Sequence, residues 1–587
     1  MAALGAGAVL KRLANLLMPE ERRLDMYGGD SVHQYLASYR KMGRDGCAMR
    51  LAELETAHYQ MDSSLHHLAD PEQLCTSALL YAASRLPLCM PQVKTVALAA
   101  QQAAFANHPW GSIAGWQQVS ADKRRRRAFF DGRERLAMLV SSLSDIDDLI
   151  PSLCAYQIEW NKLHQRLARS PLGPALAGGR ERASAVGQEL RRALGLGRPD
   201  YEALAQLWGN GWDDKLAAVA TGPKDMELLM LPLTPEDFDA AAQRWWQKLL
   251  KLFQGMDLDG RPVYLVTSNN HSLTNLMSGF AGRHQAALAS HGHERLEPEW
   301  AEAYRRLSAE KTPALRNLLY LAQDGLLASE PGLAAVKAEM ENEAGVRRTG
   351  QVPPLLAETQ LIELNKILPG RLDPRLRVSD PAALARSRAV VFNTDYPLGF
   401  GAYHLLRSAG AYLPDWRGLF VLGKSAAMIG RLGDVMIPTQ VRDVHSARLF
   451  ELPNCMNARR LVRYVHDAAV FDDQRSLTVH GTFLHSWDTV RRLHQADFTG
   501  IEMEAGPCLA ALADQFMPQI ACQGGLVRLA LPQGFSLGIL HYTSDTPYNL
   551  RASLLSKPLG ITGLESTYTC SLAILQYILE RACIPGG

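Results

Sequence analysis

The stretch DFTGIEMEAGPCLAALAD, Asp497 to Asp514, decides the fold of the C-terminal half of the chain. It opens as a short apolar strand, passes through Glu502-Met503-Glu504 and continues as an apolar helix. A strand that passes through a polar turn into a helix is the repeating unit of an α/β sheet, and such sheets bind ligands at the carboxyl ends of their strands. Taken alone, the two carboxylates are more simply explained as partners of the helix dipole than as a functional pair.

The same pattern of strand, polar turn and helix recurs across the C-terminal half. Stretches 261–281 and 388–410 repeat it. Stretch 418–441 reads as a strand, a glycine-rich bend and a second strand, 476–486 is strand-like, 534–549 is a strand that ends in polar residues, and a closing helix follows at 567–582. Polar or glycine-rich residues follow the strands at Asn393–Gly399, Gly423–Gly430, His480–Phe483, Glu502–Glu504 and Ser544–Asp545. Because strand ends meet at one edge of such a sheet, we expect these residues to share one crevice.

The N-terminal half has a different pattern. Residues 1–170 keep apolar residues at helical spacing, a stretch rich in Pro, Gly and Ala at 168–184 reads as a linker, and 185–258 reads as helical again. We therefore predict an α/β domain at 259–587, with a helical insertion at about 283–385, preceded by a large, mainly α-helical N-terminal region.

Composition restricts the partners. The 587 residues carry a formal net charge of +2, which gives no strong attraction to nucleic acid or membrane. The basic run Lys123–Arg127 is followed by two phenylalanines and then by acidic residues, which favours a solvated helix face over a nucleic-acid site. No stretch is apolar and long enough to span a bilayer.

Nine cysteines are scattered without a C-x-x-C pair, which indicates reduced thiols in a cytoplasmic protein. The sequence shows no cluster of His, Cys and carboxylate residues at ligand spacing, so we predict neither a metal nor a cofactor.

The ordered set VLGKSAAMIGRLGDVMIP, GIEMEAG and HYTSDTP resembles the nucleoside phosphorylase and nucleosidase superfamily. The resemblance covers roughly 388–587 and extends weakly back to 261. Within the superfamily, SDTP and the turn DYPLGFGAYH look most like the AMP nucleosidases. The resemblance implies a phosphorylase-like mixed sheet flanked by helices.

The resemblance also implies roles for single residues. Glu504 would accept hydrogen bonds from the ribose hydroxyls and stabilise an oxocarbenium-like sugar, as carboxylates do in glycoside hydrolysis. Met503 would pack on the sugar, Asp545 would protonate the leaving base and Ser544 would orient Asp545. Glu502 is either a substrate contact or a helix-start carboxylate. The further substrate-binding candidates are Phe483, which would stack on the base, Asn393, Gly399, Gly423 and Lys424.

The predicted function is hydrolysis of the N-glycosidic bond of a purine nucleotide or nucleoside, with release of the free base. Two alternatives stay open: a phosphate-dependent nucleoside phosphorylase, and a non-catalytic nucleotide sensor or scaffold. The turn NTDYPLGFG at 393–401 has two glycines and no arginine, which favours water over inorganic phosphate, whereas the glycine-poor turn at 423–430 motivates the sensor.

The expected partner is a small nucleoside or nucleotide, with inorganic phosphate in the phosphorylase alternative. The resemblance implies a homo-oligomer. We interpret His480, His485 and His541 as structural or surface residues rather than catalytic ones.

Overall fold

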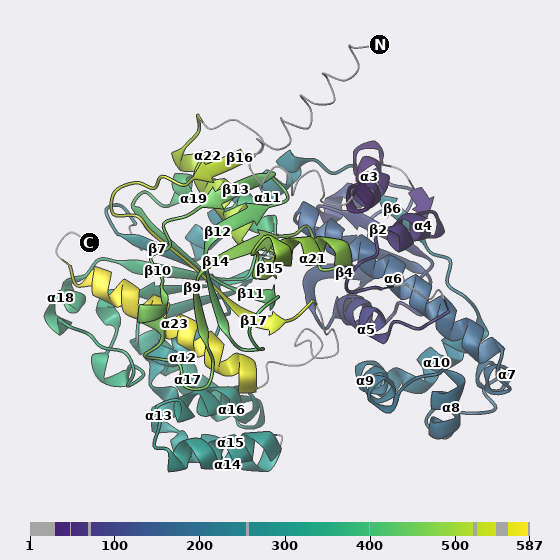
Figure 1. Ribbon diagram of the computed structural model, residues 1–587, viewed down its shortest axis with the longest axis horizontal. Coiled ribbons are helices and arrows are strands. Elements are labelled where there is room, and N and C mark those ends of the chain that lie inside the picture. The colour runs from purple at the N-terminus through teal and green to yellow at the C-terminus, as the bar shows by residue number, and fades with distance from the viewer. Residues whose placement is uncertain are drawn as a thin grey trace, which may run out of the picture. The chain divides into compact units, whose positions relative to one another are not determined.

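The chain forms two compact units, which we describe separately. The computed structural model describes residues 30–46, 48–67, 72–253, 258–296, 298–397, 399–519, 525–547 and 561–584 (Figure 1). Unit 1 falls within Met1–Ala241 together with Val479–Ala496, and unit 2 falls within Ala242–Thr478 and Asp497–Gly587. Unit 1 therefore takes in a short segment from the C-terminal half of the sequence.

Unit 1 is built on a six-stranded sheet in the order β1-β6-β2-β5-β4-β3. Its strands are β1 (Ala48–Arg50), β2 (Thr95–Ala99), β3 (Gln117–Ala121), β4 (Arg124–Phe130), β5 (Arg135–Leu139) and β6 (Glu227–Met230). Its helices are α3 (Asp30–Asp45), α4 (Ala52–Gln60), α5 (Thr76–Arg85), η1 (Gln102–Phe105), α6 (Leu143–Ala168), α7 (Leu172–Ala177), α8 (Gly187–Ala193), α9 (Arg198–Trp208), η2 (Gly209–Gly211), α10 (Trp212–Thr221) and α21 (Trp487–Gln495). The long helix α6 is buried along most of its length.

The sheet of unit 1 was not expected from the sequence, although the surrounding region is rich in helices as predicted. Strands such as β2 and β5 are short, largely apolar runs, and periodicity alone does not separate such runs from buried helical segments. The basic run Lys123–Arg127 is likewise not a helix face, because Arg124 begins β4 and its side chain is buried. Its guanidinium donates to the carbonyl oxygen of Leu139 at 3.0 Å and lies 3.4 Å from the carboxylate of Asp145. The predicted linker contains α7.

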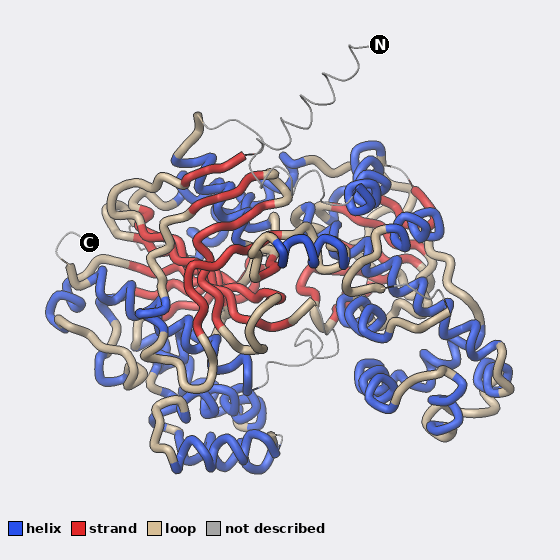
Figure 2. The backbone as a smooth tube through the Cα atoms, in the orientation of Figure 1, coloured by secondary structure: helices blue, strands red, loops and turns tan. Residues whose placement is uncertain are grey.

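Unit 2 is built on an eleven-stranded mixed sheet, drawn in red in Figure 2. Its strands are β7 (Val263–Ser268), β8 (Val346–Val352), β9 (Ala357–Glu363), β10 (Val390–Asp395), β11 (Trp416–Ala427), β12 (Val435–Asp443), β13 (Arg448–Glu451), β14 (Val470–Thr478), β15 (Gly500–Glu502), β16 (Gly525–Arg528) and β17 (Ser536–Asp545). The order is β16-β13-β12-β14-β15-β11-β7-β10-β9-β8, and β17 pairs with both β11 and β12. Strands β7, β10, β11 and β17 are mutually parallel and apolar, as expected for strands covered on both faces.

Five strands of this sheet close on themselves. β11 pairs with β17, β17 with β12, β12 with β14, β14 with β15, and β15 again with β11. The ring brings β15, which carries Glu502, next to β11 and close to β17. Stretches far apart in the sequence thus meet at one end of the sheet.

Helices cover the sheet of unit 2. They are α11 (Pro235–Leu252), α12 (Ser272–Ser278), α13 (Phe280–Arg283), α14 (Gln285–Arg295), α15 (Pro298–Ala309), α16 (Leu315–Ser329), α17 (Pro331–Glu343), η3 (Leu364–Lys366), η4 (Pro369–Arg371), α18 (Pro381–Arg386), α19 (Gly401–Tyr412), α20 (Ala458–Leu461), α22 (Ala505–Phe516) and α23 (Ile561–Ala582). The main core joins Leu276, Leu318 and Leu572 of α12, α16 and α23 to Val266 and Leu540 of the sheet. The predicted helical insertion is helical only in part, because it contains the hairpin β8–β9.

Candidate functional site

The candidate site lies where strand β11 runs between β15 and β17. Ala426 of β11 pairs with Ile501 on one side and with Asp545 on the other. With neighbouring strands about 4.8 Å apart, the chain segments that carry Glu502–Glu504 and Ser544–Asp545 are roughly 10 Å apart across β11. The two motifs that sequence analysis placed in one crevice therefore flank the same segment of β11, with β15 antiparallel and β17 parallel to it.

Glu504 is the residue before α22, and its side chain is partly exposed. Removal from bulk water and the neighbouring Glu502 raise the pKa of Glu504 to about 8, while the charge of Lys424 acts in the opposite direction. Lys424 is exposed on β11, so a cation lies within electrostatic reach of this carboxyl group. Met503 is also partly exposed. These residues have the access to solvent that a ligand contact requires.

Glu502 holds the backbone of Glu504 in place, because its carboxyl oxygens accept hydrogen bonds from the protein. One oxygen accepts the backbone N–H groups of Glu504 at 2.6 Å and Ala505 at 2.7 Å, and the other accepts the hydroxyl of Thr478. Burial raises the pKa of Glu502 to about 7. Glu502 is thus a buried carboxyl group that fixes the start of α22 and the backbone of Glu504.

His541 is the third member of this cluster. It lies on β17 in register with Gly423 of β11, and its Nε2 atom is 3.7 Å from Glu502 Oε2, with both side chains fully buried. Burial lowers the pKa of His541 to about 4. Full burial fits the interpretation of His541 as structural, but its closeness to Glu502 was not predicted, because the two residues come from strands distant in sequence.

Ser544 and Asp545 lie at a bulge in β17. Ser425 pairs with Thr543 and the next residue of β11, Ala426, pairs with Asp545, so Ser544 is the extra residue. A bulge re-aims a side chain at the end of a strand and is common beside active sites. Asp545 is 5% exposed and accepts the backbone N–H of Thr546 at 3.1 Å.

The turn after β10 brings in Tyr396, which sequence analysis did not select. Burial, followed by the influence of Tyr542 and Asp395, raises the pKa of Tyr396 well above its usual value, and Glu504 adds to this effect. A hydrogen bond with Asn269 acts against it. Tyr396 and Asn269 therefore belong to the surroundings of Glu504. The turn NTDYPLGFG contains this tyrosine, but only its glycines and its lack of arginine entered the sequence prediction.

Asn393 is built into the sheet rather than opened to a ligand. Its amide Nδ2 donates to the Asn269 carbonyl oxygen and to Gln360 Oε1, each at 2.9 Å, and its Oδ1 accepts the Ser268 hydroxyl at 2.7 Å. The side chain is 1% exposed. We therefore assign Asn393 to positioning the turn that follows β7.

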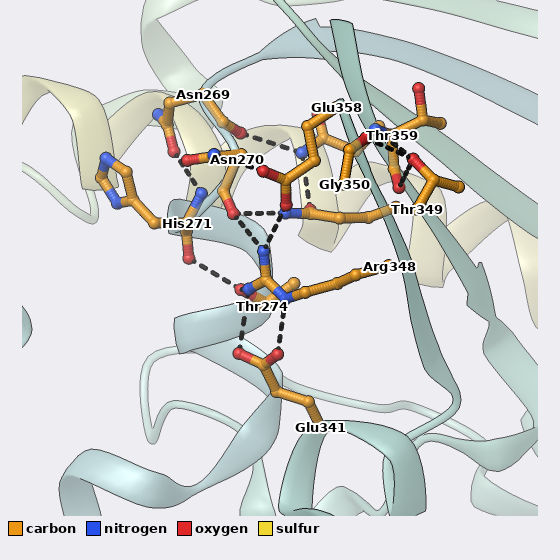
Figure 3. Close-up of polar contacts among 12 residues, drawn as sticks. Asn269, Asn270, His271, Thr274, Glu341, Arg348, Thr349, Gly350, Glu358 and Thr359 are labelled. Atoms are coloured by element: carbon orange, nitrogen blue, oxygen red, sulfur yellow. Dashed lines mark hydrogen bonds and ion pairs between the residues drawn. The ribbon is translucent and has the colours of Figure 1, made fainter. Parts of the chain in front are cut away.

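A second set of contacts holds the same turn from the hairpin β8–β9 (Figure 3). Arg348 donates to both carboxylate oxygens of Glu341, at 2.7 and 3.0 Å, and to Glu358 at 3.0 Å. It also donates to the Asn270 carbonyl oxygen at 2.9 Å and to the Thr274 hydroxyl at 2.8 Å. One guanidinium thus ties the turn and the first turn of α12 to two carboxylates.

The remaining predicted residues lie as follows. Gly399 precedes α19 with a φ of +50°, a conformation that favours glycine. Gly423 is a buried residue of β11, not part of a loop. Phe483 lies in unit 1, 1% exposed, with ring contacts to His58, His66 and Tyr81. Its base-stacking role stays a prediction, and we leave it out of the site.

Among the residues that the structure describes, no three His, Cys, Asp or Glu side chains are arranged to hold a metal ion. None of the described helices combines the length and apolar character needed to cross a membrane.

Comparison with known proteins gives a family without an assigned activity. The model of DUF6909, described as a family of unknown function, matches residues 51–580. No curated protein matches the sequence.

Solved structures give distant likenesses only. An MTAN mutant from Helicobacter pylori with 5'-methylthioadenosine in its active site is 9% identical, with 55% of this chain and 99% of that chain covered and a TM-score of 0.30. The 5'-methylthioadenosine/S-adenosylhomocysteine nucleosidases from Neisseria meningitidis and S. pneumoniae are 15% and 12% identical. Each covers 41% of this chain and 94% of its own, with a TM-score of 0.27. Similarity at this level carries no argument about activity.

Proposed function

The chain belongs to the family of unknown function DUF6909, and we propose that its unit 2 hydrolyses the N-glycosidic bond of a purine nucleoside or nucleotide. One observation carries the proposal: Ala426 lies between Ile501 and Asp545, so the Glu-Met-Glu and Ser-Asp motifs flank a single strand. A nucleoside has two parts that need different chemistry, a sugar and a base. Two motifs on either side of one strand match that requirement.

In this mechanism Glu504 binds the sugar. A carboxylate accepts hydrogen bonds from the 2'- and 3'-hydroxyls and stabilises the positive charge that develops on the ring as the glycosidic bond breaks. Its partial exposure gives the ribose access, and the two backbone N–H bonds to Glu502 fix its position. Met503 packs against the apolar face of the sugar.

Asp545 acts on the base. Protonation at N7 turns a purine into a good leaving group, and a nearly buried carboxylic acid at the end of β17 is placed to supply that proton. The bulge at Ser544 sets the direction of the Asp545 side chain. Water then attacks the anomeric carbon, which gives the free base and ribose or ribose phosphate.

Lys424 favours a phosphate-bearing ligand. It is an exposed ammonium group whose charge reaches Glu504, so it lies near the sugar end of the proposed site. A lysine binds phosphate as a point charge. The phosphate is either the 5'-phosphate of a nucleotide or, in the alternative of a nucleoside phosphorylase, the inorganic phosphate that replaces water.

The test is release of base from AMP, adenosine, inosine, guanosine and methylthioadenosine, with and without inorganic phosphate. We expect release without phosphate, and an Asp545→Asn variant that retains its fold and loses the activity by about 10²–10⁴-fold. A Ser536→Ala variant on the same strand serves as the matched control.

The other outcomes separate the alternatives. Release that requires inorganic phosphate would replace hydrolysis by phosphorolysis. Thermal stabilisation by one of these compounds without any release would replace the enzyme by a nucleotide sensor. No release and no stabilisation would overturn the proposal.

A further inference from the structure

His541 occupies a position that structural needs do not explain. It is fully buried on β17, and neither ring nitrogen has a hydrogen-bond partner among the residues that the structure describes. A buried polar group without a partner costs about 1–3 kcal/mol. An apolar residue at this position would avoid that cost, so the imidazole calls for an explanation in function.

The space around His541 is shaped by a glycine. A Cβ atom on Gly423 would lie 2.6 Å from His541 Cδ2, 3.0 Å from its Nε2 and 3.7 Å from Glu504 Oε2. The absent side chain thus leaves room in which the imidazole approaches the two carboxyl groups. Glu502 Oε2 is 3.7 Å from His541 Nε2, and a small rotation of either side chain would bring them into hydrogen-bond contact.

The carboxyl groups of Glu502 and Glu504 repel each other when both are ionised. Glu502 raises the pKa of Glu504, because two neighbouring carboxylates do not both ionise readily. Ribose binding needs Glu504 ionised, since a carboxylate accepts both sugar hydroxyls and a carboxylic acid does not. A proton held by the pair therefore has to leave when the sugar arrives.

We propose that His541 receives this proton, so that nucleoside binding converts the neutral imidazole and the protonated carboxyl pair into an imidazolium–Glu502 ion pair beside an ionised Glu504. The O–H bond of the carboxyl pair breaks, an N–H bond forms at Nε2, and no proton is exchanged with solvent. His541 is a positioning residue, because it acts through Glu502 and does not touch the substrate. The inference rests on the proposed function, in which Glu504 binds ribose.

Other titratable groups face the pair and do not replace His541 in this role. Asp443 on β12 accepts hydrogen bonds from His445 and Ser446, which lower its pKa. Cys508 on α22 is a buried thiol whose pKa is raised by that burial. Lys424, Tyr396 and Tyr542 complete the surroundings. Only a neutral imidazole among these groups can gain a proton and become an ion-pair partner.

The test counts protons on binding of formycin A and formycin B, C-nucleoside analogues whose carbon–carbon glycosidic bond does not hydrolyse. Calorimetry at pH 7 in two buffers of different ionisation enthalpy gives the number released. We expect the native protein to release almost none and to bind with similar affinity at pH 6 and 7. A His541→Gln variant should release about one proton and bind about tenfold more weakly at pH 6 than at pH 7, because ionisation of Glu504 then needs solvent to take the proton.

A second variant guards against misfolding. Glu502→Gln in the His541→Gln background removes the like charge, lets Glu504 ionise alone and should restore an affinity that varies little with pH. His284→Gln, which removes a partly buried histidine elsewhere in unit 2, is the matched control and should behave as the native protein.

Each result has a distinct meaning. If the native protein binds and releases a full proton, or if His541→Gln has the native pH dependence, the relay is wrong while the proposed function stands. If the native protein binds neither analogue and releases no base from any nucleoside, the proposed function fails, and the relay fails with it.

Discussion

Each unit of the chain buries a histidine next to carboxyl groups, but only unit 1 satisfies its hydrogen bonds. In unit 1 the Nδ1 atom of His58 lies 3.2 Å from the Tyr35 hydroxyl, and its Nε2 lies 2.9 Å from His66 Nδ1. His66 Nε2 lies 2.9 Å from Glu159, which also binds Lys162 at 2.7 Å. In the described part of unit 2 His541 has no hydrogen-bond partner, and its neighbouring carboxyl groups have raised pKa values.

The difference separates a structural network from a functional one. Glu159 has a lowered pKa despite complete burial, because hydrogen bonds and charges from His66 and Lys162 stabilise its ionised form. In the Glu502–Glu504 pair, the hydrogen bonds to Glu502 and the charge of Lys424 do not outweigh burial, and both pKa values stay raised. A buried polar network that is complete stabilises a fold, whereas one left incomplete costs stability and is retained where a ligand completes it.

Removal of Glu159 should have the largest effect on stability. Glu159→Leu leaves Lys162 and His66 buried without their carboxylate, and the loss of one partner from a buried ion pair costs about 3–5 kcal/mol. Denaturant unfolding of the whole chain measures this loss, with the exposed Glu227→Gln of unit 1 as control. An effect as small as that of the control would show that the network of unit 1 is not structural.

Replacement of Glu504 should lower activity and raise stability. Glu504→Gln removes the sugar carboxylate, and we expect base release to fall roughly 10²–10³-fold. Thermal stability at pH 8 should rise, because the substitution removes repulsion with Glu502. Glu294→Gln, an exposed glutamate of α14, should change neither property. Loss of stability together with activity would place Glu504 among the structural residues.

The two networks should also respond to pH with opposite sign. His58 and His66 have lowered pKa values, so unit 1 keeps their contribution above the unfolded value near 6.5 and loses it as the pH falls below that value. Glu502 and Glu504 have raised values of about 7 and 8, so their cost disappears as the pH falls from 8 towards 4.5. Hydrogen exchange at pH 5.5 and 7.5, corrected for intrinsic rates, should show weaker protection at acid pH around α4 and α6, and stronger protection around β15 and β17.

Sequence analysis predicted the α/β architecture of unit 2 because strands such as β7, β10 and β11 begin with apolar runs and are followed by polar or glycine-rich turns. The predicted stretches do contain strands, namely β7, β10, β11, β15 and β17, and only β11 begins outside its stretch, by two residues. The pairing of Ala426 with both motifs follows from strand order, which no local pattern encodes. The sheet of unit 1 was missed because its strands have three to seven residues and resemble buried helical segments.

The candidate site was predictable where one motif holds the chemistry, as at Glu504, and unpredictable where chemistry depends on neighbours. His541 is unremarkable in sequence, and its importance comes from Gly423 and Glu502, which are 118 and 39 positions away. Arg348 lies in a stretch predicted to be helical, yet it belongs to a hairpin that holds the turn after β7. Asn393 shows the reverse error, since its place at a strand end suggested a ligand contact and its amide is used inside the sheet.

Each network contains one lysine, and the smallest effect is expected from Lys424, the lysine of unit 2. Lys162 is buried and donates to Glu159 and to the Gln73 carbonyl oxygen, whereas Lys424 is exposed near Glu504. Lys424→Met should leave folding unchanged and raise the pKa of Glu504 further, because a nearby positive charge is lost. Exposed charge pairs contribute about 0.2–1 kcal/mol, so activity towards adenosine at pH 7 should fall by no more than about fivefold. Lys424→Arg, which keeps the charge, is the control. If Lys424 also binds the 5'-phosphate, the loss should be larger for AMP than for adenosine, and equal losses would confine the lysine to an electrostatic role on Glu504.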